Sequence, residues 1–591
     1  MSDPHASPQT LAATAPHSPA PQRPRILALI VTLVGLAAIV GAGVFITRGG
    51  GPRPAVPGPC NGCPDEQVLH VAWVGNGTQV SALDPSIASD TTNLPIVSLL
   101  YDTLMTTDQR LTPRLWGADQ VSVSADGRTY SFHIRAGQVF SDGMPVYASD
   151  YAYGITRALD PCLQSPMNYV LWMIQGAERF SDPKNCVHHA AAQPLTAVVA
   201  DDGAATLTIT LQQPAAYFLA ALTTPVDAAL ERGAVAGPDQ GKDEHWTAGL
   251  VATGAHPTGQ GGSGMYYVAQ YDADGHLILK QNPHWWGTKP YLKEMDYTIF
   301  PDANQALAAY DAGTTYDAVQ VPGDAYAASA GKRDFHTAPL AAIRALTFNW
   351  QFPPFDNPDA RQAFCLAINR DHWVAGALQG TALPSWHLVP QGMPGYNTGL
   401  TGVDGVLATT GDVAKARAHW AAYLATLHGA KVPPITFTYF FGRSSSPAVA
   451  QSLAQQWNAA FGAGTVTTMP LYPGGPRVKE ELPWPQMTFF GWLADYPDPQ
   501  DFLSLLYTSG SMYNRWHASV PAADALLARA DAGGSGIDRM SLYHQAEQLL
   551  VQQVAVCPLY QYQQAYRVRS YVRNYVENAG GTLALDQWRQ V

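Results

Sequence analysis

Residues 124–146 read SADGRTYSFHIRAGQVFSDGMPV, and the pattern of this stretch predicts the local structure on which the expected fold class rests. Between Thr129 and Arg135 the side chains alternate in character from one residue to the next, which is the period of a half-buried strand. Ser149-Asp150 then supplies an N-cap for a helix that we expect to run through Leu159 and to stop at Asp160-Pro161. A strand followed closely by a helix predicts an α/β unit.

Outward from this stretch, short strand-like runs and helix-like runs alternate along the chain. They follow no repeat of fixed period, so the sequence predicts α/β lobes and not a solenoid. Further strands are expected at residues 69–74, 206–211, 266–270, 277–280, 297–300 and 435–440. Helices are expected at residues 304–311, 359–369, 412–427, 447–460 and 537–554.

The composition of the chain limits its function. A chain of 591 residues with 47% hydrophobic side chains is more than one core needs, so at least two packed lobes are expected. The net charge of −12 leaves no domain-scale basic surface, which argues against nucleic acid as a partner. The HExxH, GxSxG and GxxxxGK[ST] patterns are missing from the sequence. We therefore expect no enzyme activity, no catalytic residues, no cofactor and no metal site.

The N-terminus predicts the compartment. Residues 1–25 are rich in Pro, Ala and Ser and are expected to be a disordered tail. Residues 26–47 carry no charge and are long enough for a single transmembrane helix, although the apolar part of a cleaved signal peptide is the alternative. Residues 48–66 form a Gly/Pro-rich tether. We expect a single-pass protein of the cell membrane whose C-terminal body is extracellular or periplasmic.

All six cysteines follow the predicted helix, which suits an oxidising exterior. Cys60-Asn-Gly-Cys63 is a CxxC motif, for which a local disulfide is favoured over a redox pair or half of a zinc site. Cys162 and Cys186 are expected to pair. Cys365 lies in an apolar helical stretch and Cys557 in an apolar strand-like stretch, so each is most simply a small buried hydrophobic residue. Their pairing stays open.

Several blocks, in one order along the chain, carry a resemblance to a known family. They are Ala82-Leu-Asp-Pro85 with Leu99–Leu104, residues 124–146, Gly264–Tyr267 with Asn282–Trp286, residues 354–370, Gly491–Pro499, and Leu542 to Tyr560. Together they resemble the extracellular solute-binding proteins of family 5, the peptide-, oligopeptide- and nickel-binding receptors of ABC importers. Their order and spacing extend the resemblance from about residue 67 to residue 575.

The resemblance implies a fold. It is a bilobal α/β periplasmic-binding-protein-like architecture (type II, cluster C) with an inserted accessory domain. Lobe I would consist of residues 67–101, 225–341 and 561–591. The accessory domain would take residues 102–224, and lobe II residues 342–560. Cys162 and Cys186 would then lie inside the accessory domain.

The resemblance also implies a ligand site. Gly491-Trp492-Leu493 would supply one edge for a peptide main chain, and Ser89-Asp90-Thr91 would supply the other. Asp495 resembles the residue that pairs with the α-ammonium of the peptide, although a helix cap or a structural salt bridge is the alternative role. Trp492 and Tyr496 would flank the ligand, or else belong to the core. For the carboxylate of the ligand, we leave open the choice among Arg443, Arg477 and Lys479.

We thus expect a membrane-anchored, monomeric receptor that captures peptides between two lobes and delivers them to the permease subunits of an ABC transporter. A receptor of the same fold for a nickel chelate, an opine, haem or a saccharide is an alternative. A ligand sensor without transport is another, and an anchored hydrolase is the least favoured. One departure from the family supports the N-terminal helix as the membrane anchor, because Cys60 follows Pro57-Gly-Pro59 and no lipobox of small residues.

Overall fold

A computed structural model gives the structure of the chain. It describes residues 67–572 with gaps, together with residue 575. The gaps are 76, 78, 81, 187–194, 236–243, 314, 441–446, 472–483 and 535. All of the described residues belong to one unit of the chain, residues 58–591.

The expectations for the N-terminus fall on residues before 67. The tail, the predicted transmembrane helix at 26–47 and the tether with Cys60 and Cys63 therefore lie outside the described residues. Within residues 67–572, none of the described helices has the length and apolar character that a bilayer span requires.

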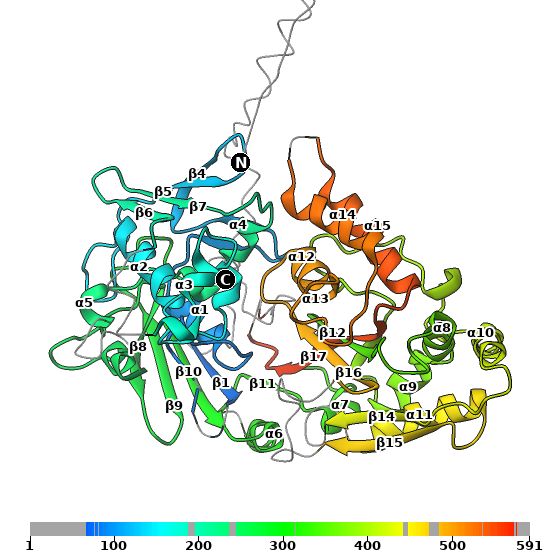
Figure 1. The fold of residues 1–591 in the computed structure, drawn as a ribbon. Helices are drawn as coiled ribbons and strands as arrows, with labels where there is room; N and C mark the ends of the chain where they lie inside the picture. Colours follow the sequence, from blue (N-terminus) through cyan, green and yellow to red (C-terminus); the bar gives the residue numbers. More distant parts are fainter. Residues whose placement is uncertain are drawn as a thin grey trace, which may run out of the picture. The chain divides into compact units, whose positions relative to one another are not determined.

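A mixed 11-stranded sheet runs through the described residues (Figure 1). Its strand order is β15-β14-β16-β12-β17-β11-β1-β10-β9-β8, and β13 pairs with β17 beside this path. β12 is antiparallel to both β16 and β17, whereas β1 is parallel to both β10 and β11. The strands are β1 (Val68–Val74), β8 (Tyr266–Tyr271), β9 (His276–Gln281), β10 (Glu294–Phe300), β11 (Ala318–Gln320), β12 (Phe335–Phe348), β13 (Ala382–Pro384), β14 (Ile435–Phe440), β15 (Val466–Leu471), β16 (Met487–Leu493) and β17 (Cys557–Val568).

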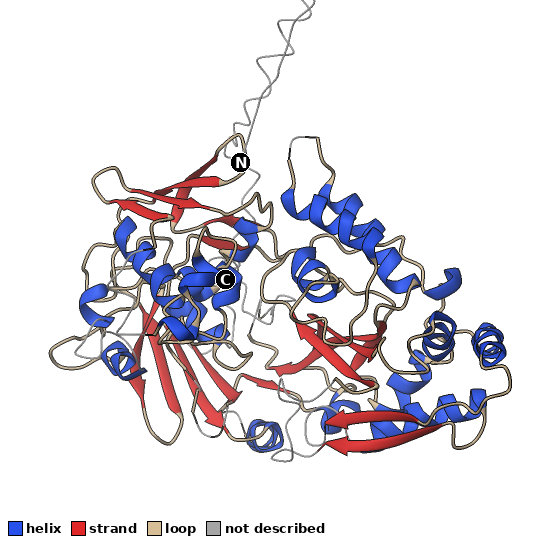
Figure 2. Cartoon of the chain, viewed as in Figure 1, coloured by secondary structure: helices blue, strands red, loops and turns tan. Residues whose placement is uncertain are grey.

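Two smaller sheets lie between β1 and β8 in sequence (Figure 2). One has the order β4-β5-β7-β6 and the other pairs β2 with β3. The predicted strand at 129–135 is confirmed as β5, with alternate side chains buried, and the predicted helix at 149–159 is confirmed as α2. The predicted cap is wrong, because Tyr147 is the N-cap and Asp150 lies in the first turn, where its carboxylate accepts from the Tyr147 backbone amide at 2.7 Å. These strands are β2 (Met105–Thr107), β3 (Pro113–Leu115), β4 (Ala118–Val123), β5 (Thr129–Ile134), β6 (Val198–Asp201) and β7 (Thr206–Thr210).

The helices confirm the predicted positions with one change. The helix expected at 359–369 is α8, which already ends at Leu366, and the Asn369 side chain accepts a hydrogen bond from the backbone amide of His372 and so begins a separate helix, α9. The α-helices are α1 (Leu94–Leu100), α2 (Ala148–Ala158), α3 (Ala177–Phe180), α4 (Phe218–Ala221), α5 (Arg232–Val235), α6 (Ala303–Ala312), α7 (Tyr326–Ser329), α8 (Pro358–Leu366), α9 (Arg370–Ala377), α10 (Val413–Thr426), α11 (Pro447–Phe461), α12 (Pro499–Phe502), α13 (Ser504–Tyr507), α14 (Pro521–Ala532) and α15 (Arg539–Gln552).

The long strand β12 was not among the predicted strands. Its sequence, FHTAPLAAIRALTF, contains Pro339 and four alanines, and Ala and Pro are poor strand formers. In the sheet it lies between β16 and β17, and its second half is almost entirely buried. A strand whose two faces are both buried loses the alternating pattern that marks half-buried strands, so tertiary packing decides this element.

Three clusters of buried apolar side chains provide most of the core. One draws on residues 341–560 together with Leu111. A second draws on residues 104–229 together with Tyr496. The third draws on residues 69–299 and contains buried side chains of β1, β8, β9 and β10.

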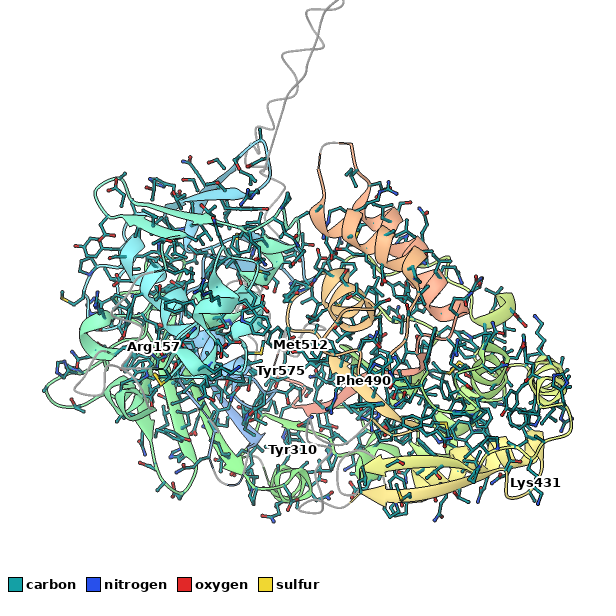
Figure 3. All side chains as sticks on the ribbon, in the orientation of Figure 1. Arg157, Tyr310, Lys431, Phe490, Met512 and Tyr575 are labelled. Atoms are coloured by element: carbon teal, nitrogen blue, oxygen red, sulfur yellow. A yellow bond between two sulfur atoms is a disulfide. The ribbon has the colours of Figure 1, made fainter. Side chains whose placement is uncertain are left out.

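A buried ion pair joins the Ala82-Leu-Asp-Pro85 block to α2. Asp84 is 0% exposed and Arg157 is 1% exposed. The Arg157 guanidinium donates to both carboxylate oxygens, at 2.8 Å and 2.6 Å. The Asp84 carboxylate also accepts from the Trp246 indole at 2.9 Å and from the Ser86 backbone amide at 2.9 Å. Because every partner donates a hydrogen bond, these contacts compensate the cost of burying the Asp84 carboxylate. Arg157 is labelled in Figure 3.

Two disulfides are formed in the described residues. Cys162 pairs with Cys186, as predicted, and the bond lies within the region of the smaller sheets. Cys365 pairs with Cys557, which corrects the expectation that each is simply a buried hydrophobic residue. Both are fully buried, but the packing of α8 against the start of β17 brings them together from a separation of 192 residues.

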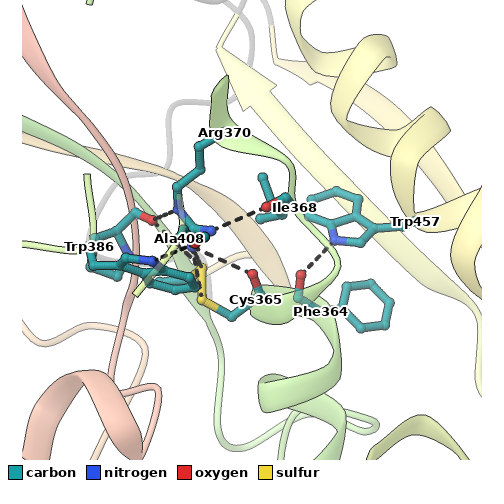
Figure 4. Close-up of a disulfide and its surroundings, with 9 residues drawn as sticks. Phe364, Cys365, Ile368, Arg370, Trp386, Ala408 and Trp457 are labelled. Carbon is teal, nitrogen blue, oxygen red and sulfur yellow. Dashed lines mark hydrogen bonds between the residues drawn. A yellow bond between two sulfur atoms is a disulfide. The ribbon is translucent and has the colours of Figure 1, made fainter. Parts of the chain in front are cut away.

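The Cys365–Cys557 disulfide has a buried arginine beside it (Figure 4). The Arg370 guanidinium donates to the Pro558 carbonyl at 2.8 Å and lies 3.5 Å from the centre of the Trp386 ring. Burial lowers the pKa of Arg370 to about 9. Backbone carbonyls and an aromatic face therefore stabilise this cation.

Candidate ligand-binding site

The end of β16 positions the predicted block at 491–493. Gly491, Trp492 and Leu493 pair with Arg344, Ile343 and Ala342 of β12. On the other edge, β14 pairs with β16 only at Met487 and Thr488 within the described residues. The main chain of β16 from Phe489 onward therefore has one edge bonded to β12 and one edge without a described strand.

Gly491 is exposed, and the space beside it is narrow. A Cβ atom at this position would come within 3.2 Å of a guanidinium nitrogen of Arg344. The Arg344 guanidinium also lies 4.8 Å from the centre of the Phe489 ring. Arg344 was not predicted to place a positive charge near residues 491–493, because only the pairing of β12 with β16 brings it there.

Asp495 follows β16 directly and meets a tyrosine from a distant part of the chain. Its carboxylate accepts a hydrogen bond from the hydroxyl of Tyr169, which lies in a 3-10 helix, η1 (Asn168–Leu171). Its backbone amide donates to the Asp501 carboxylate at 3.1 Å. The Trp492 indole donates to the same Asp501 oxygen at 3.2 Å. Two carboxylates, an indole and a phenol thus converge at the end of β16.

The pKa values of both carboxylates of this group are raised. Burial raises the pKa of Asp495 to about 6, against the opposing effect of the hydrogen bonds to its carboxylate. Burial raises the pKa of Asp501 well above its usual range, and the nearby Asp495 charge raises it further. Two like charges held in one buried group oppose each other's ionisation, so the pair holds a proton more readily than two separate carboxylates would.

The two alternative roles considered for Asp495 belong to its neighbour Asp498. The Asp498 side chain caps α12 by accepting from the backbone amide of Gln500, and it forms an ion pair with Arg539 at 3.0 Å. Asp495 has no ion pair among the described residues. A carboxylate with a raised pKa and no cation beside it is able to accept a positively charged ligand group.

Aromatic rings surround the carboxylate pair. The Tyr513 ring lies 5.0 Å from the Trp492 ring and 6.0 Å from the Tyr169 ring, both edge-to-face. The Phe490 ring stacks on Trp492 at 6.4 Å, and Figure 3 labels Phe490 on β16. Tyr169, Tyr513 and Asp501 were not predicted. No local pattern marks the two tyrosines, whereas Asp501 stands near enough to the quoted 491–499 block to have been included.

Tyr496 lies elsewhere in the packing. It is 4% exposed, its hydroxyl donates to the Gln500 side chain, and its ring stacks on Tyr217 at 6.2 Å. It belongs to the second apolar cluster. These contacts favour the core alternative for Tyr496.

The segment Ser89-Asp90-Thr91 forms a turn that begins α1. The Asp90 carboxylate accepts from the backbone amides of Thr92 at 2.8 Å and Asn93 at 3.1 Å, which organises the turn. Ser89 and Thr91 are exposed. Thr91 also lines a cleft of about 550 Å³.

This cleft is bounded by β1, β11 and β17 and is named here the tyrosine cleft. Its volume falls within the range of about 300–1,000 Å³ that small-ligand sites occupy. Asp495 is not among its lining residues. The rings that define it are those of Trp73, Tyr326, Tyr560, Tyr562, Tyr566 and Tyr575.

The three cations considered for a ligand carboxylate, Arg443, Arg477 and Lys479, lie outside the described residues. A search of the described residues for groups of three or more His, Cys, Asp or Glu side chains that could hold a metal ion found none.

Comparisons with known proteins agree on one family. The family described as bacterial extracellular solute-binding proteins, family 5 Middle, matches residues 112–514. The oligopeptide-binding protein OppA of Bacillus subtilis is 24% identical over 82% of this chain and 86% of its own length. The probable deoxycholate-binding periplasmic protein YgiS of Escherichia coli is 26% identical over 82% of this chain and 86% of its own.

Among solved structures, the unliganded open form of MppA, a periplasmic murein tripeptide binding protein, is similar in fold. The TM-score is 0.72 at 22% identity, and the alignment covers 88% of this chain and 97% of that protein. This similarity supports the mixed α/β architecture of the family.

Proposed function

We propose that this chain, which belongs to family 5 of the bacterial extracellular solute-binding proteins, captures peptides and delivers them to the permease of an ABC importer without catalysis. The observation that carries the proposal is the Asp495–Asp501 pair at the end of β16. It offers one negative charge, largely shielded from water, to a ligand ammonium. The peptide-binding relatives named above support the same ligand class.

The α-ammonium of a peptide would bind at Asp495. An ammonium has three donors, and Asp495 supplies an ionised acceptor within a ring of aromatic side chains. Desolvation strengthens the attraction between opposite charges, so the contact gains as the ligand is enclosed. A ligand that binds the closed state better than the open state shifts the receptor towards closure.

The peptide main chain would add to the edge of β16 that has no partner strand among the described residues. The described pairing leaves Phe489 to Leu493 bonded on the β12 side alone, so main-chain donors and acceptors on the other side face outward. A peptide that lies along Gly491–Leu493 would bond to them as an extra strand, and Ser89 to Thr91 would provide the opposite edge. Affinity then depends mainly on the peptide backbone.

We further propose that the chain has lobe I at 67–101, 225–341 and 561–591, an accessory domain at 102–224 and lobe II at 342–560. The three apolar clusters support these divisions, since their members fall almost entirely within the proposed segments. Two of the side-chain contacts that would join the parts involve residues of the predicted blocks. Asp84 and Arg157 link lobe I to the accessory domain, and Asp495 and Tyr169 link lobe II to it.

Binding of an unmodified peptide should be strongest between about pH 6 and pH 8. Asp495 must be ionised to bind an ammonium, and its raised pKa of about 6 means that affinity falls as the pH drops below that value. The fall should approach about tenfold per pH unit well below the pKa. Above about pH 8 the α-amino group of the peptide loses its proton, so affinity falls again.

Calorimetry of the purified full chain with an unmodified pentapeptide, from pH 4.5 to 9, measures this profile. If the chain binds no peptide at any pH, the proposed function is wrong. A flat profile below pH 6 would instead show that Asp495 does not receive the amine. Release of the bound ligand by denaturation, followed by mass spectrometry, would identify the natural ligand.

We also propose that residues 26–47 remain in the mature protein as a transmembrane anchor that keeps the receptor close to its permease. Intact-mass analysis of protein from the membrane fraction should find the chain with these residues and without lipid. A mature N-terminus beyond residue 47, or a lipid on Cys60, contradicts the anchor. Neither outcome affects peptide capture.

Bile-acid binding is the second candidate, because a relative named for deoxycholate is as similar as the peptide-binding one. An anionic ligand would be repelled by the single charge of the Asp495–Asp501 pair. Deoxycholate therefore serves as a comparison ligand in the same calorimetric series. Tighter binding of deoxycholate than of every peptide would favour the second candidate.

A further inference from the structure

The tyrosine cleft differs chemically from the acidic group at the end of β16. Among the residues that line it in the described part of the chain, none carries a charged side chain. Valines of β1 and β11 and the aromatic rings give it apolar walls, and Gln563 and Gln564 of β17 add amide groups.

One residue that lines the cleft, Leu340, lies in β12 close to the strand end that leads to Asp495. The Ala494 backbone amide donates to the Ala341 carbonyl at 2.8 Å, which extends the pairing of β16 with β12 by one residue. Asp495 follows Ala494 beyond β16, and Leu340 precedes Ala341 in β12. Leu340 lines the cleft. Neighbouring strands lie about 4.8 Å apart. A peptide whose amine is at Asp495 thus has the cleft within reach of its first residues.

We propose that the tyrosine cleft receives a side chain near the amino end of the peptide and selects neutral, bulky side chains, aromatic or amide, against charged ones. The proposal rests on the proposed function and adds the substrate class. A Lys or Glu side chain would be buried there without a counter-charge, which is costly. An aromatic ring would pack against the tyrosine rings and the valines. An uncharged amide can form hydrogen bonds with the hydroxyl and amide groups among the lining residues.

Calorimetry of the full chain with glycine-based pentapeptides tests the selection. Each peptide carries one substituted residue, which is Phe, Gln, Glu or Lys, at one of positions one to four. At one position at least, the Phe and Gln peptides should bind ten or more times tighter than both the Glu and the Lys peptides. If Glu and Lys are within threefold of Gln at every position, the selection is wrong although peptide capture stands. If no peptide of the set binds, the proposed function fails and the selection fails with it.

Charge substitutions in the cleft locate the contact. Gln563 is half-buried and lines the cleft, so Gln563→Glu and Gln563→Lys place opposite charges in it. At the selective position, Gln563→Glu should improve the ratio of Lys-peptide to Glu-peptide affinity at least tenfold, and Gln563→Lys should reverse that ratio. Gln213→Glu, on an exposed residue outside the cleft, is the matched control and should leave the ratio unchanged. Equal ratios in all three variants would overturn the proposal.

Discussion

Asp84→Asn should destabilise the folded protein by about 3–5 kcal/mol, because it leaves Arg157 as a buried charge without its counter-ion. Arg157 is 1% exposed and bonds to both oxygens of Asp84. The asparagine keeps the size of the side chain and one oxygen, so the loss reports the charge and not a cavity. Urea unfolding of the full chain, followed by fluorescence, measures the change in the free energy of unfolding.

A matched control separates burial from charge. Glu294→Gln removes the carboxylate from the partly exposed pair with Lys280, whose closest atoms are 3.4 Å apart, and should cost no more than about 1 kcal/mol. The double variant Asp84→Asn/Arg157→Met should be less destabilised than the sum of the single variants, since neither charge then remains buried alone. If Asp84→Asn and Glu294→Gln have equal effects, the buried pair does not stabilise the contact between the first block and α2.

Asp495→Asn should weaken peptide binding by about 1.5–3 kcal/mol, or roughly ten- to a hundredfold, because a charge-assisted hydrogen bond becomes a neutral one. The substitution keeps the side-chain size and an oxygen that accepts from Tyr169. It removes the charge that the α-ammonium is proposed to meet. N-acetylation of the peptide removes the ammonium instead.

The four combinations of protein and peptide form a thermodynamic cycle. Acetylation should weaken binding to the natural protein strongly and should have a much smaller effect on Asp495→Asn. Calorimetry at pH 7 measures all four affinities, and urea unfolding checks that the variant is folded. An equal cost of acetylation in both proteins would show that the amine binds elsewhere, and the peptide assignment would lose its main residue.

Several parts of the site follow from sequence alone. The 491–499 block, through its resemblance to the family, directed attention to Asp495, and the structure places Asp495 at the end of a strand beside Asp501 and Trp492. Local patterns also predicted β5 and α2, because alternation and caps act over a few residues. The peptide contacts themselves stay a proposal.

Other parts could not be predicted from local patterns. The Tyr169 hydroxyl reaches Asp495 across 326 residues, and no local signal marks that tyrosine. The same limit applied to Cys365 and Cys557, whose apolar surroundings indicated burial but not a shared position. The separation of roles between Asp495 and Asp498 required the cap of α12 and the Arg539 ion pair.

The sequence by itself determined the alternation of strands and helices, the family and the block that contains Asp495, since these depend on neighbouring residues and on order along the chain. Only the tertiary structure decided which residues share a surface. The placement of β12 between β16 and β17 puts the end of β16, just before Asp495, beside Ala341 and Ala342, and their neighbour Leu340 lines the uncharged cleft. Pairing between distant strands is selected by burial and register over the whole sheet, so a local stretch of sequence does not specify it.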